Sequence, residues 1–495
     1  MKNKYQFRRQ FILSSNPQFS FEGWTNLKLD ENINLSAHPD LEVTQSSFGT
    51  IQLTLLGFVI NPFEPLKSNQ EILDDLVKGT NGFNDVLSKT DQLGGRWIII
   101  YKNNQSFKIF HDPCGQRQVY FHNNLENEIL CGSDPSIMNH FVTLEKDTTL
   151  SINEFIHSAA FEEKENAWIG SGTIYQGVEH LMPNHYLNVN ELKSIRFWPN
   201  KPIEKLDLEK AAGIAAEMLK GSLQAIGNRH KLALAVTAGW DSRILLAASK
   251  QVKDNSVYFV SLTGLEGDNY HDLVVPKRLF KKMGLPFYAQ KCDVELDPEF
   301  KKNLESNVAM ARINLNKAKF IYKYHLDFDG MMSVNGNVSE IARTCVRPLF
   351  PMKTTGENIA KLGYFRYGGL SYVTTQFNKW IDGINDLCEK NNLNIYDMLY
   401  WEQRMGNWGA QYPAEQDISI DQFSPFNNRL LLTTLLSVDE KYRKDPKYIL
   451  HFKIIEKLWP ETLLEPIGKT GKKRMIKLKI KNVISVFVRL FLFQK

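Results

Sequence analysis

Cysteine is scarce in this chain of 495 residues, and its scarcity excludes two kinds of stabilised fold. The five cysteines are odd in number and scattered, and no two of them form a Cys-x-x-Cys pair. A disulfide framework needs an even, closely spaced set and a structural zinc site needs paired thiols, so we expect neither. Reduced thiols of this kind are typical of a cytoplasmic protein, which is the location we predict.

Long apolar runs are also missing. No window reaches about 18 apolar residues, the length that a transmembrane helix requires. Arg8 and Arg9 interrupt the first residues before an apolar core of signal-peptide length develops. We therefore expect neither a membrane-spanning helix nor a secretory signal.

Acidic residues are absent from residues 471–495, which carry eight Lys or Arg. Removing those eight charges from the net charge of +5 leaves about −3 on the rest of the chain, so we expect no nucleic-acid partner. Apolar residues recur at helical spacing from Ile480 to Phe491. Two interpretations stay open for this basic tail: a helix docked on the body, or an amphipathic segment in peripheral contact with a membrane.

The length of the chain exceeds what one hydrophobic core serves, so we expect at least two domains. The first 140 residues are rich in short strand-like runs bounded by Gly, Asn, Asp or Pro, and residues 69–78 have helical spacing. Two prolines in residues 196–207 indicate a linker. From residue 208 onward helices and apolar strands alternate, which predicts a parallel sheet with helices on its faces.

The sequence Thr-Ala-Gly-Trp-Asp-Ser-Arg at 237–243 joins the apolar run Leu232–Val236 to a predicted helix. Small residues let the backbone approach a ligand, and the helix start offers free N–H groups to an anion. Ser242 is expected to cap the helix and to donate to a phosphate. Asp241 fits an anion site only if a cation lies between the acid and the phosphate, which predicts Mg²⁺ and ATP here. The spacing differs from that of a Walker A loop, and Gly468–Thr470 lacks the upstream glycine because Leu463 stands there.

This loop resembles the pyrophosphate loop of the ATP pyrophosphatase class, in particular that of asparagine synthetases and β-lactam synthetases. Residues 256–290 resemble the family's next strand, acidic loop, helix and strand. Residues 333–343 stand where the family has an acidic loop that grips pyrophosphate and magnesium. Residues 400–439 and 463–474 resemble its late helix and its final Lys-containing loop, and residues 93–121 resemble its class II glutaminase half.

The resemblance implies an α/β architecture with two domains and a tail. Residues 1–200 would form an αββα sandwich of the Ntn-hydrolase type, a degenerate glutaminase. Residues 206–470 would form a doubly wound parallel-sheet ATP pyrophosphatase domain with an added helical part, and residues 471–495 the tail. Whether the chain is a homodimer stays open.

Two parts of the family pattern are altered. An active glutaminase of this class uses an N-terminal Cys directly after the initiator Met, whereas this chain starts Met1–Lys2 and its first cysteine is Cys114. Leu56 and Phe58 stand where the family binds glutamine. We therefore expect no glutamine hydrolysis. In the acidic loop, Glu340 is the expected surviving metal carboxylate, with a helix-capping acid as its alternative.

The resemblance implies an ATP-dependent amide-forming ligase that activates a small-molecule or glycan carboxylate as an acyl-adenylate, for attack by ammonia or an amine. The alternative is a non-catalytic scaffold or binding subunit derived from an asparagine synthetase. Lys469 is assigned to the tetrahedral intermediate and Glu402 to deprotonating the amine, with a solvated lysine and an Arg-paired acid as the alternatives. Arg243 would contact a phosphate or the substrate carboxylate, or form a salt bridge on the helix face. The expected metal ligands are Asp241 and Glu340, and the expected nucleotide contacts are Thr237, Ala238, Gly239, Trp240, Asp241, Ser242, Arg243, Ser261, Leu262 and Gly336.

Overall fold

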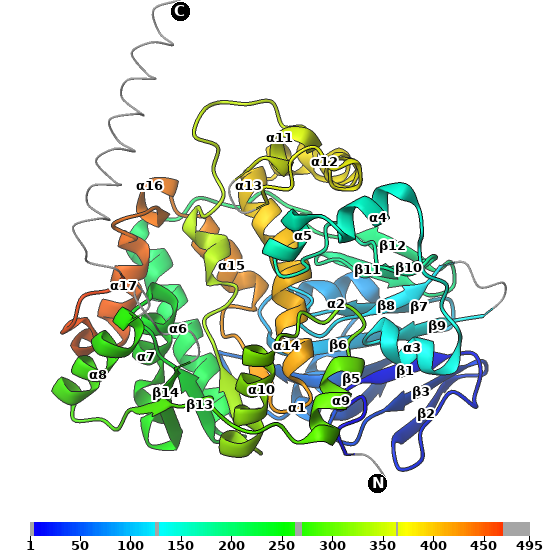
Figure 1. Ribbon diagram of the computed structural model, residues 1–495, viewed down its shortest axis with the longest axis horizontal. Coiled ribbons are helices and arrows are strands. Elements are labelled where there is room, and N and C mark those ends of the chain that lie inside the picture. Colours follow the sequence, from blue (N-terminus) through cyan, green and yellow to red (C-terminus); the bar gives the residue numbers. More distant parts are fainter. Residues whose placement is uncertain (1–3, 124–127, 263–269, 363–364, 469–495) are drawn as a thin grey trace, which may run out of the picture.

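The structure is a computed structural model that describes residues 4–123, 128–262, 270–362 and 365–468 (Figure 1). Its described part contains two six-stranded antiparallel sheets and one five-stranded parallel sheet, with helices around them. The predicted mixed α/β architecture with a parallel sheet is therefore confirmed. Lys469 and the basic tail of residues 471–495 lie outside the described residues, so the predictions about them stay predictions.

The two antiparallel sheets are built from residues 11–196. The first has the order β10-β8-β9-β1-β3-β2 and the second the order β12-β11-β7-β6-β5-β4. The strands of the first sheet are β1 Phe11–Ser14, β2 Thr25–Asp30, β3 Ile33–Ala37, β8 Tyr120–His122, β9 Leu130–Gly132 and β10 Val178–His180. Those of the second are β4 Val43–Phe48, β5 Ile51–Ile60, β6 Gly94–Lys102, β7 Phe107–His111, β11 His185–Asn188 and β12 Lys193–Arg196.

The two sheets pack face to face because their strands alternate apolar side chains toward each other. Leu56 of β5 and Ile98 of β6 join Leu13 of β1 in the core between the sheets. The intervening Leu55 and Ile99 point to the other face, where α1 (Asn69–Val77) and α2 (Phe83–Thr90) cover them. Helix α3 (Pro135–Phe141) covers the outer face of the first sheet. The layers therefore run helix, sheet, sheet, helix.

The parallel sheet has the order β15-β14-β13-β16-β17. Its strands are β13 Leu232–Ala235, β14 Ser256–Ser261, β15 Tyr288–Gln290, β16 Met332–Val334 and β17 Asp421–Phe423. From β13 the chain moves outward to β15, then returns to the other side of β13 as β16. The strand order therefore reverses between β13 and β16, and the loops that follow these two strands separate at the carboxyl edge of the sheet.

Helices cover both faces of the parallel sheet. On one face α6 (Leu208–Gly227), α7 (Trp240–Ala248) and α8 (His271–Met283) pack on Leu232 and Leu234. On the other, α10 (Leu315–Phe328) packs on Ala233 and Phe259. The remaining helical segments are α4 Leu150–Ile156, α5 Ala159–Glu163, η1 Ser249–Asn255, α9 Pro298–Ser306, η3 Ser339–Arg343, α11 Gly356–Ala360, α12 Ser371–Lys390, α13 Ile395–Met398, η4 Leu399–Gly409, α14 Ala410–Gln416, α15 Arg429–Leu436, α16 Glu440–Arg443, α17 Ile449–Leu458 and η5 Pro460–Leu463.

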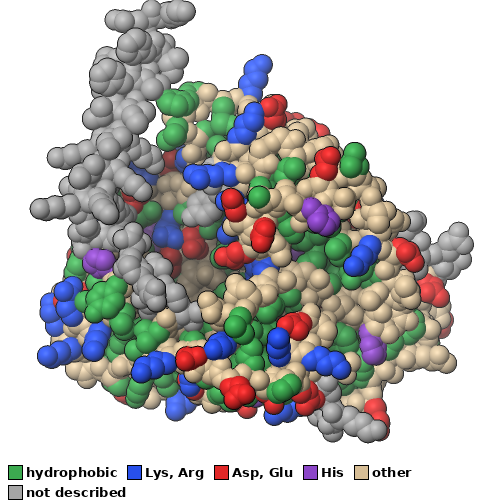
Figure 2. Space-filling view, in the orientation of Figure 1, with side chains coloured by type: hydrophobic (Ala, Val, Ile, Leu, Met, Phe, Trp, Pro, Cys, Tyr) green, Lys and Arg blue, Asp and Glu red, His purple; other side chains and the backbone are tan. Residues whose placement is uncertain are grey.

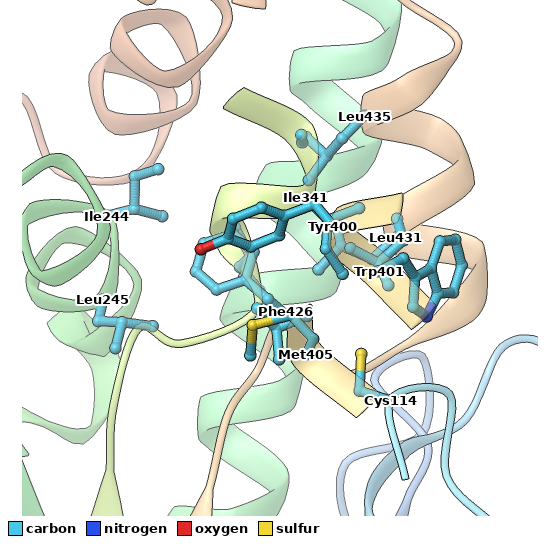
Figure 3. Close-up of a cluster of buried hydrophobic side chains, with 14 of the residues drawn as sticks. Cys114, Ile244, Leu245, Ile341, Tyr400, Trp401, Met405, Phe426, Leu431 and Leu435 are labelled. Carbon is cyan, nitrogen blue, oxygen red and sulfur yellow. The ribbon is translucent and has the colours of Figure 1, made fainter. Parts of the chain in front are cut away.

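The sandwich and the parallel-sheet half share one hydrophobic core. Phe58, Ile60 and Cys114 from the first half belong to the same buried cluster as Leu245 and Trp401 from the second. Figure 3 shows part of this cluster, with Cys114 beside Met405 and Trp401 of η4 and with Ile244 and Leu245 of α7 farther away. Among the described residues, none of the helices has the length and apolar character to cross a bilayer.

Candidate functional site

The loop between β13 and α7 is folded by two hydroxyl side chains. The Ser242 hydroxyl accepts from the backbone N–H of Thr237 at 3.1 Å and lies 3.0 Å from the Thr237 hydroxyl. The Thr237 hydroxyl in turn accepts from the N–H of Gly239 at 3.2 Å. The prediction that Ser242 caps the helix is wrong, because Gly239 is the N-cap residue and Ser242 lies in the first turn, where it bonds back to the loop. The loop is thus a compact turn at a helix start.

The loop after β16 makes direct contact with this turn. A Cβ built on Gly336 would lie 2.6 Å from the Cβ of Asp241, so only glycine allows the two backbones to approach this closely. The Ser339 hydroxyl donates to Asp241 Oδ1. The reversal of strand order therefore brings two segments almost 100 residues apart in sequence into one site.

Asp241 and Glu340, the two predicted metal carboxylates, share one guanidinium. Arg343 Nη2 lies 2.9 Å from Asp241 Oδ2 and 3.3 Å from Glu340 Oε1. All three side chains are largely buried, with exposed fractions of 20%, 23% and 15% for Asp241, Glu340 and Arg343. Arg343 lies only seven residues beyond Gly336, within residues 333–343, which were compared with an acidic loop. Its role as the partner of both acids was not predicted.

Burial shapes the protonation of this triad. Burial and the Asp241 charge together raise the pKa of Glu340 to about 7, against the lowering effect of Arg343. Burial also raises the pKa of Asp241, against the lowering effects of Arg343 and the Ser339 hydroxyl. For Arg343, burial lowers the pKa but the two carboxylates outweigh it, so the pKa is raised. The guanidinium therefore stays charged.

The residues present fit a magnesium ion carried by a nucleotide rather than a metal cage made by the protein. Among the described residues, no group of three or more His, Cys, Asp or Glu side chains is arranged to hold a metal. Magnesium bound with a nucleotide commonly uses one or two carboxylates and takes its other ligands from phosphates and water. Asp241 and Glu340 supply two carboxylates, and Glu340 Oε2 is buried without a hydrogen-bond partner in the described structure.

A further acid, Asp272, contacts the loop from α8. Its Oδ1 accepts from the backbone N–H of Ala238 at 2.9 Å, one of the donors predicted to face a phosphate. Asp272 is not among the site residues predicted from the sequence. Its position in the sequence could have indicated it, because it lies in the first turn of α8, the helix that follows the neighbouring strand β14.

Arg243 does not have either of its predicted roles. It is fully buried, and its guanidinium donates to the backbone carbonyls of Thr462 and Glu465 at 2.7 Å and of Pro466 at 3.2 Å. Burial lowers the pKa of Arg243 to about 10, with the Glu465 carboxylate opposing. The side chain thus fastens residues 462–466 to α7. Shortly after this segment, the N–H of Gly468 donates to the Ala238 carbonyl at 2.7 Å.

Three other predicted nucleotide contacts, Ser261, Leu262 and Trp240, lie at the end of the neighbouring strand or at the start of α7. Ser261 ends β14 beside β13, and its hydroxyl donates to Gln290 Oε1 at 2.7 Å. The backbone N–H of Leu262 donates to the Gln290 carbonyl, so that donor is already used. The ring of Trp240 packs on Tyr448 with centroids 5.5 Å apart. The face drawn in Figure 2 is hollowed in its left half, with acidic and basic side chains inside the hollow.

Glu402 is held in a different environment from the turn. Both of its oxygens are occupied, by Arg196 at 2.5 and 2.8 Å, by the Asn184 amide at 2.8 Å and by the Trp380 indole N–H at 2.8 Å. The side chain is 1% exposed. Burial raises its pKa, but Arg196 more than compensates, so the pKa is lowered and the carboxylate stays ionised. The Arg-paired alternative is the one that the structure shows, in the protein interior instead of on a helix surface.

The three positions that were compared with a glutaminase, Leu56, Phe58 and Cys114, are all buried in apolar packing. Leu56 is buried between the two antiparallel sheets, and Phe58 packs on Phe423 of β17 with ring centroids 5.9 Å apart. Cys114 is completely buried, its backbone N–H bonded to the Asn427 side chain at 3.0 Å. Burial raises the pKa of the Cys114 thiol well above its usual value. Phe58 and Cys114 join the two halves of the molecule, whereas Leu56 lies inside the first half.

Comparison with solved structures finds similarities of low extent, among them the following two. Glutamine phosphoribosylpyrophosphate amidotransferase from B. subtilis, complexed with ADP and GMP, aligns with a TM-score of 0.25 and 11% identity over 52% of this chain. An allosteric regulatory enzyme of purine biosynthesis aligns with a TM-score of 0.25 and 10% identity over 47% of it. The alignments span 60% and 55% of those two chains. No protein-family model and no curated protein matches the sequence.

Proposed function

We propose that this protein is an asparagine synthetase-like, ATP-dependent amide-forming ligase. One observation carries the proposal: the loops after β13 and β16 meet at the reversal of strand order and place Asp241 and Glu340 on the same side of a compact turn at a helix start. A nucleotide site at such a reversal is the general rule for open parallel sheets.

In this proposal the triphosphate lies over residues 237–242, where the start of α7 offers positive potential. The N–H groups of Thr237, Ala238 and Gly239 are bonded within the site, so the first turn of α7 supplies the donors. Asp241 and Glu340 would hold the Mg²⁺ that accompanies ATP, and that ion would neutralise phosphate charge. A substrate carboxylate attacks the α-phosphate, which forms an acyl-adenylate and releases pyrophosphate. An amine then attacks the acyl carbon and AMP leaves. The chain contributes positioning and electrostatic stabilisation to both steps.

The nitrogen is proposed to come from ammonia or an amine, and not from glutamine hydrolysed by this chain. The support is the packing of Leu56 and Phe58, which fills the glutamine-binding positions with apolar side chains. Cys114 supports it too, because a fully buried thiol with a raised pKa is a poor nucleophile. Lys469 remains the proposed partner of the tetrahedral intermediate. Glu402 is no longer proposed as the base, since its oxygens are fully engaged.

A non-catalytic scaffold is the second candidate, and the observation that favours it is Arg343. Its guanidinium already neutralises both proposed metal carboxylates. A site that had lost its nucleotide would be stable in this form, because two buried acids without a cation would repel each other.

The test is to incubate the pure protein with Mg-ATP, ammonia and a panel of carboxylates and to measure AMP and amide by mass. We expect AMP with at least one carboxylate, and a loss of at least about 100-fold in Asp241→Asn, since a charged contact to the metal-nucleotide is removed. Asp134→Asn, a buried acid of the first half, is the matched control and should keep the rate. Absence of AMP with every carboxylate would favour the scaffold.

A further inference from the structure

Several buried polar atoms around the triad lack a hydrogen-bond partner within the described residues. They are Arg343 Nε, Glu340 Oε2 and both ring nitrogens of His451. Arg343 and His451 lie on the same aromatic ring, since the guanidinium is 5.7 Å from the centre of Tyr448 and the imidazole is 5.7 Å from it. An unpaired buried polar group costs about 1–3 kcal/mol, so such atoms seldom gather where no ligand completes them.

The position of Arg343 is fixed by the backbone on both sides of it. Segment η3 follows Val338, with φ of 82°, and precedes Thr344, with φ of 51°. Both are β-branched residues in the left-handed region, which costs free energy and persists only where the surrounding structure imposes it. The backbone conformation on both sides of η3 therefore fixes where the Arg343 side chain starts, next to Asp241.

The donors of Arg343 divide into two sets. Nη2 serves the two carboxylates, whereas Nε faces no acceptor among the described residues. A guanidinium has five N–H donors in a planar fork and binds phosphate oxygens well. One arginine is therefore able to hold the acids with one end and to donate to an anion with the other.

We propose that Arg343 is the resident cation of the nucleotide site: it keeps Asp241 and Glu340 together in the absence of metal and donates through Nε to the phosphate chain. This inference rests on the proposed nucleotide site. A site with two acids alone would repel ATP once magnesium is removed, because every charge facing the phosphates would be negative. With Arg343 in place, ATP retains most of its affinity when the divalent ion is removed.

The experiment is calorimetric titration of ATP into the full chain, in excess Mg²⁺ and again in EDTA. The variants are Arg343→Met, which removes the charge, and Arg343→Lys, which keeps the charge but lacks Nε. The matched control is Arg8→Met, because Arg8 also bridges two acids, Asp40 and Asp329, and its side chain is 14% exposed. Circular dichroism and thermal melting establish that each variant is folded.

For the wild type we expect the dissociation constant in EDTA to stay within about tenfold of its value in Mg²⁺. In EDTA, Arg343→Met should bind about 10- to 100-fold more weakly than the wild type, the loss of a charge-assisted hydrogen bond, and should recover in Mg²⁺ because the metal replaces the cation. The dissociation constant of Arg343→Lys in EDTA should lie between those of the wild type and Arg343→Met. If Arg343→Met does not fold, the Lys variant alone tests the inference. Arg8→Met should bind like the wild type.

Two outcomes contradict different claims. If Arg343→Met in EDTA binds ATP as tightly as the wild type or more tightly, or if Arg343→Lys equals the wild type where the Met variant does not fold, Arg343 only competes for the acids and the inference is overturned. If the wild type binds no ATP in either buffer, the proposed function itself is wrong.

Discussion

His180 is a fully buried imidazole in the first half of the chain, stacked on Tyr120 with ring centroids 4.8 Å apart. Burial and the neighbouring His111 together lower its pKa to about 3, with Asn407 opposing. The folded state therefore binds fewer protons than the unfolded state below about pH 6.5, so stability is lost as the pH falls through that value toward 3.

Replacing His180 with Phe removes this pH-dependent penalty. Relative to the wild type, the free energy of unfolding of His180→Phe should rise by about 1.5 kcal/mol between pH 6.5 and pH 5, whatever the offset at neutral pH. Urea unfolding at the two pH values measures the difference. His157→Phe, at an exposed position, is the control for loss of an imidazole. A wild-type-to-variant difference that stays constant with pH would show that His180 is protonated in the folded state.

At the scale of single residues, local chemistry predicted some site members and not others. The conflict of an acid in an anion loop predicted Mg²⁺ at Asp241, and this stays a prediction. The cation that the structure places against Asp241 is Arg343, which was not predicted. Local chemistry does not reveal which residues contact this loop from elsewhere in the chain. Arg343 is about 100 residues from Asp241 in sequence, and Asp272 is about 30 residues from Ala238. Arg243 was misjudged for the same reason, since the carbonyls that it binds belong to residues 462–466.

Helix α6 of the second half lies directly against the first half of the chain. A Cβ built on Gly221 would lie 1.9 Å from the backbone carbonyl oxygen of Pro62, which follows β5. Both atoms belong to the backbone, so a side chain at Gly221 would force helix α6 and the segment after β5 apart. Gly213, on the same helix, has no such neighbour within 4 Å.

Alanine substitutions at these two glycines should therefore have opposite effects. Gly221→Ala should lower the free energy of unfolding by about 1–3 kcal/mol, because the methyl group forces the helix away from the first half. Gly213→Ala should raise it by up to about 1 kcal/mol, since alanine is the better helix former in open space. Guanidinium unfolding of both variants measures the contrast. Stabilisation by both substitutions would contradict the close approach at Pro62.

At the scale of elements, periodicity predicted the long helix and the long strands. The first of the helices expected from residue 208 onward is α6, and two of the strand-like runs expected in the first 140 residues are β5 and β6. Strands such as β2 and β3 were not foreseen, because they are short and only partly apolar. The order of strands in the parallel sheet was likewise beyond the sequence, since it depends on which strand edges pair across the whole chain.

The two halves of the molecule are held together by a buried group of charges as well as by the shared core. Arg96 of β6 binds Asp417 at 2.5 and 2.7 Å and Asp421 at 2.9 Å, and Arg117 binds Asp421 at 3.1 Å. Both arginines are 1% exposed. Burial alone would raise the pKa of Asp421, but Arg117 and Arg96 lower it far below its usual value.

We expect this arrangement to make the two halves unfold as one unit, in spite of their different sheets. Asp421→Asn should lower the free energy of unfolding by about 3 kcal/mol, because it leaves two buried guanidinium groups with one acid between them. Since β17 carries Asp421 in the parallel sheet and β6 carries Arg96 in the sandwich, the loss should appear in both halves. Hydrogen exchange of β6 and β14 should therefore accelerate together, and calorimetry should show one transition at a lower temperature. Two transitions, with only one of them shifted, would show that the halves unfold independently.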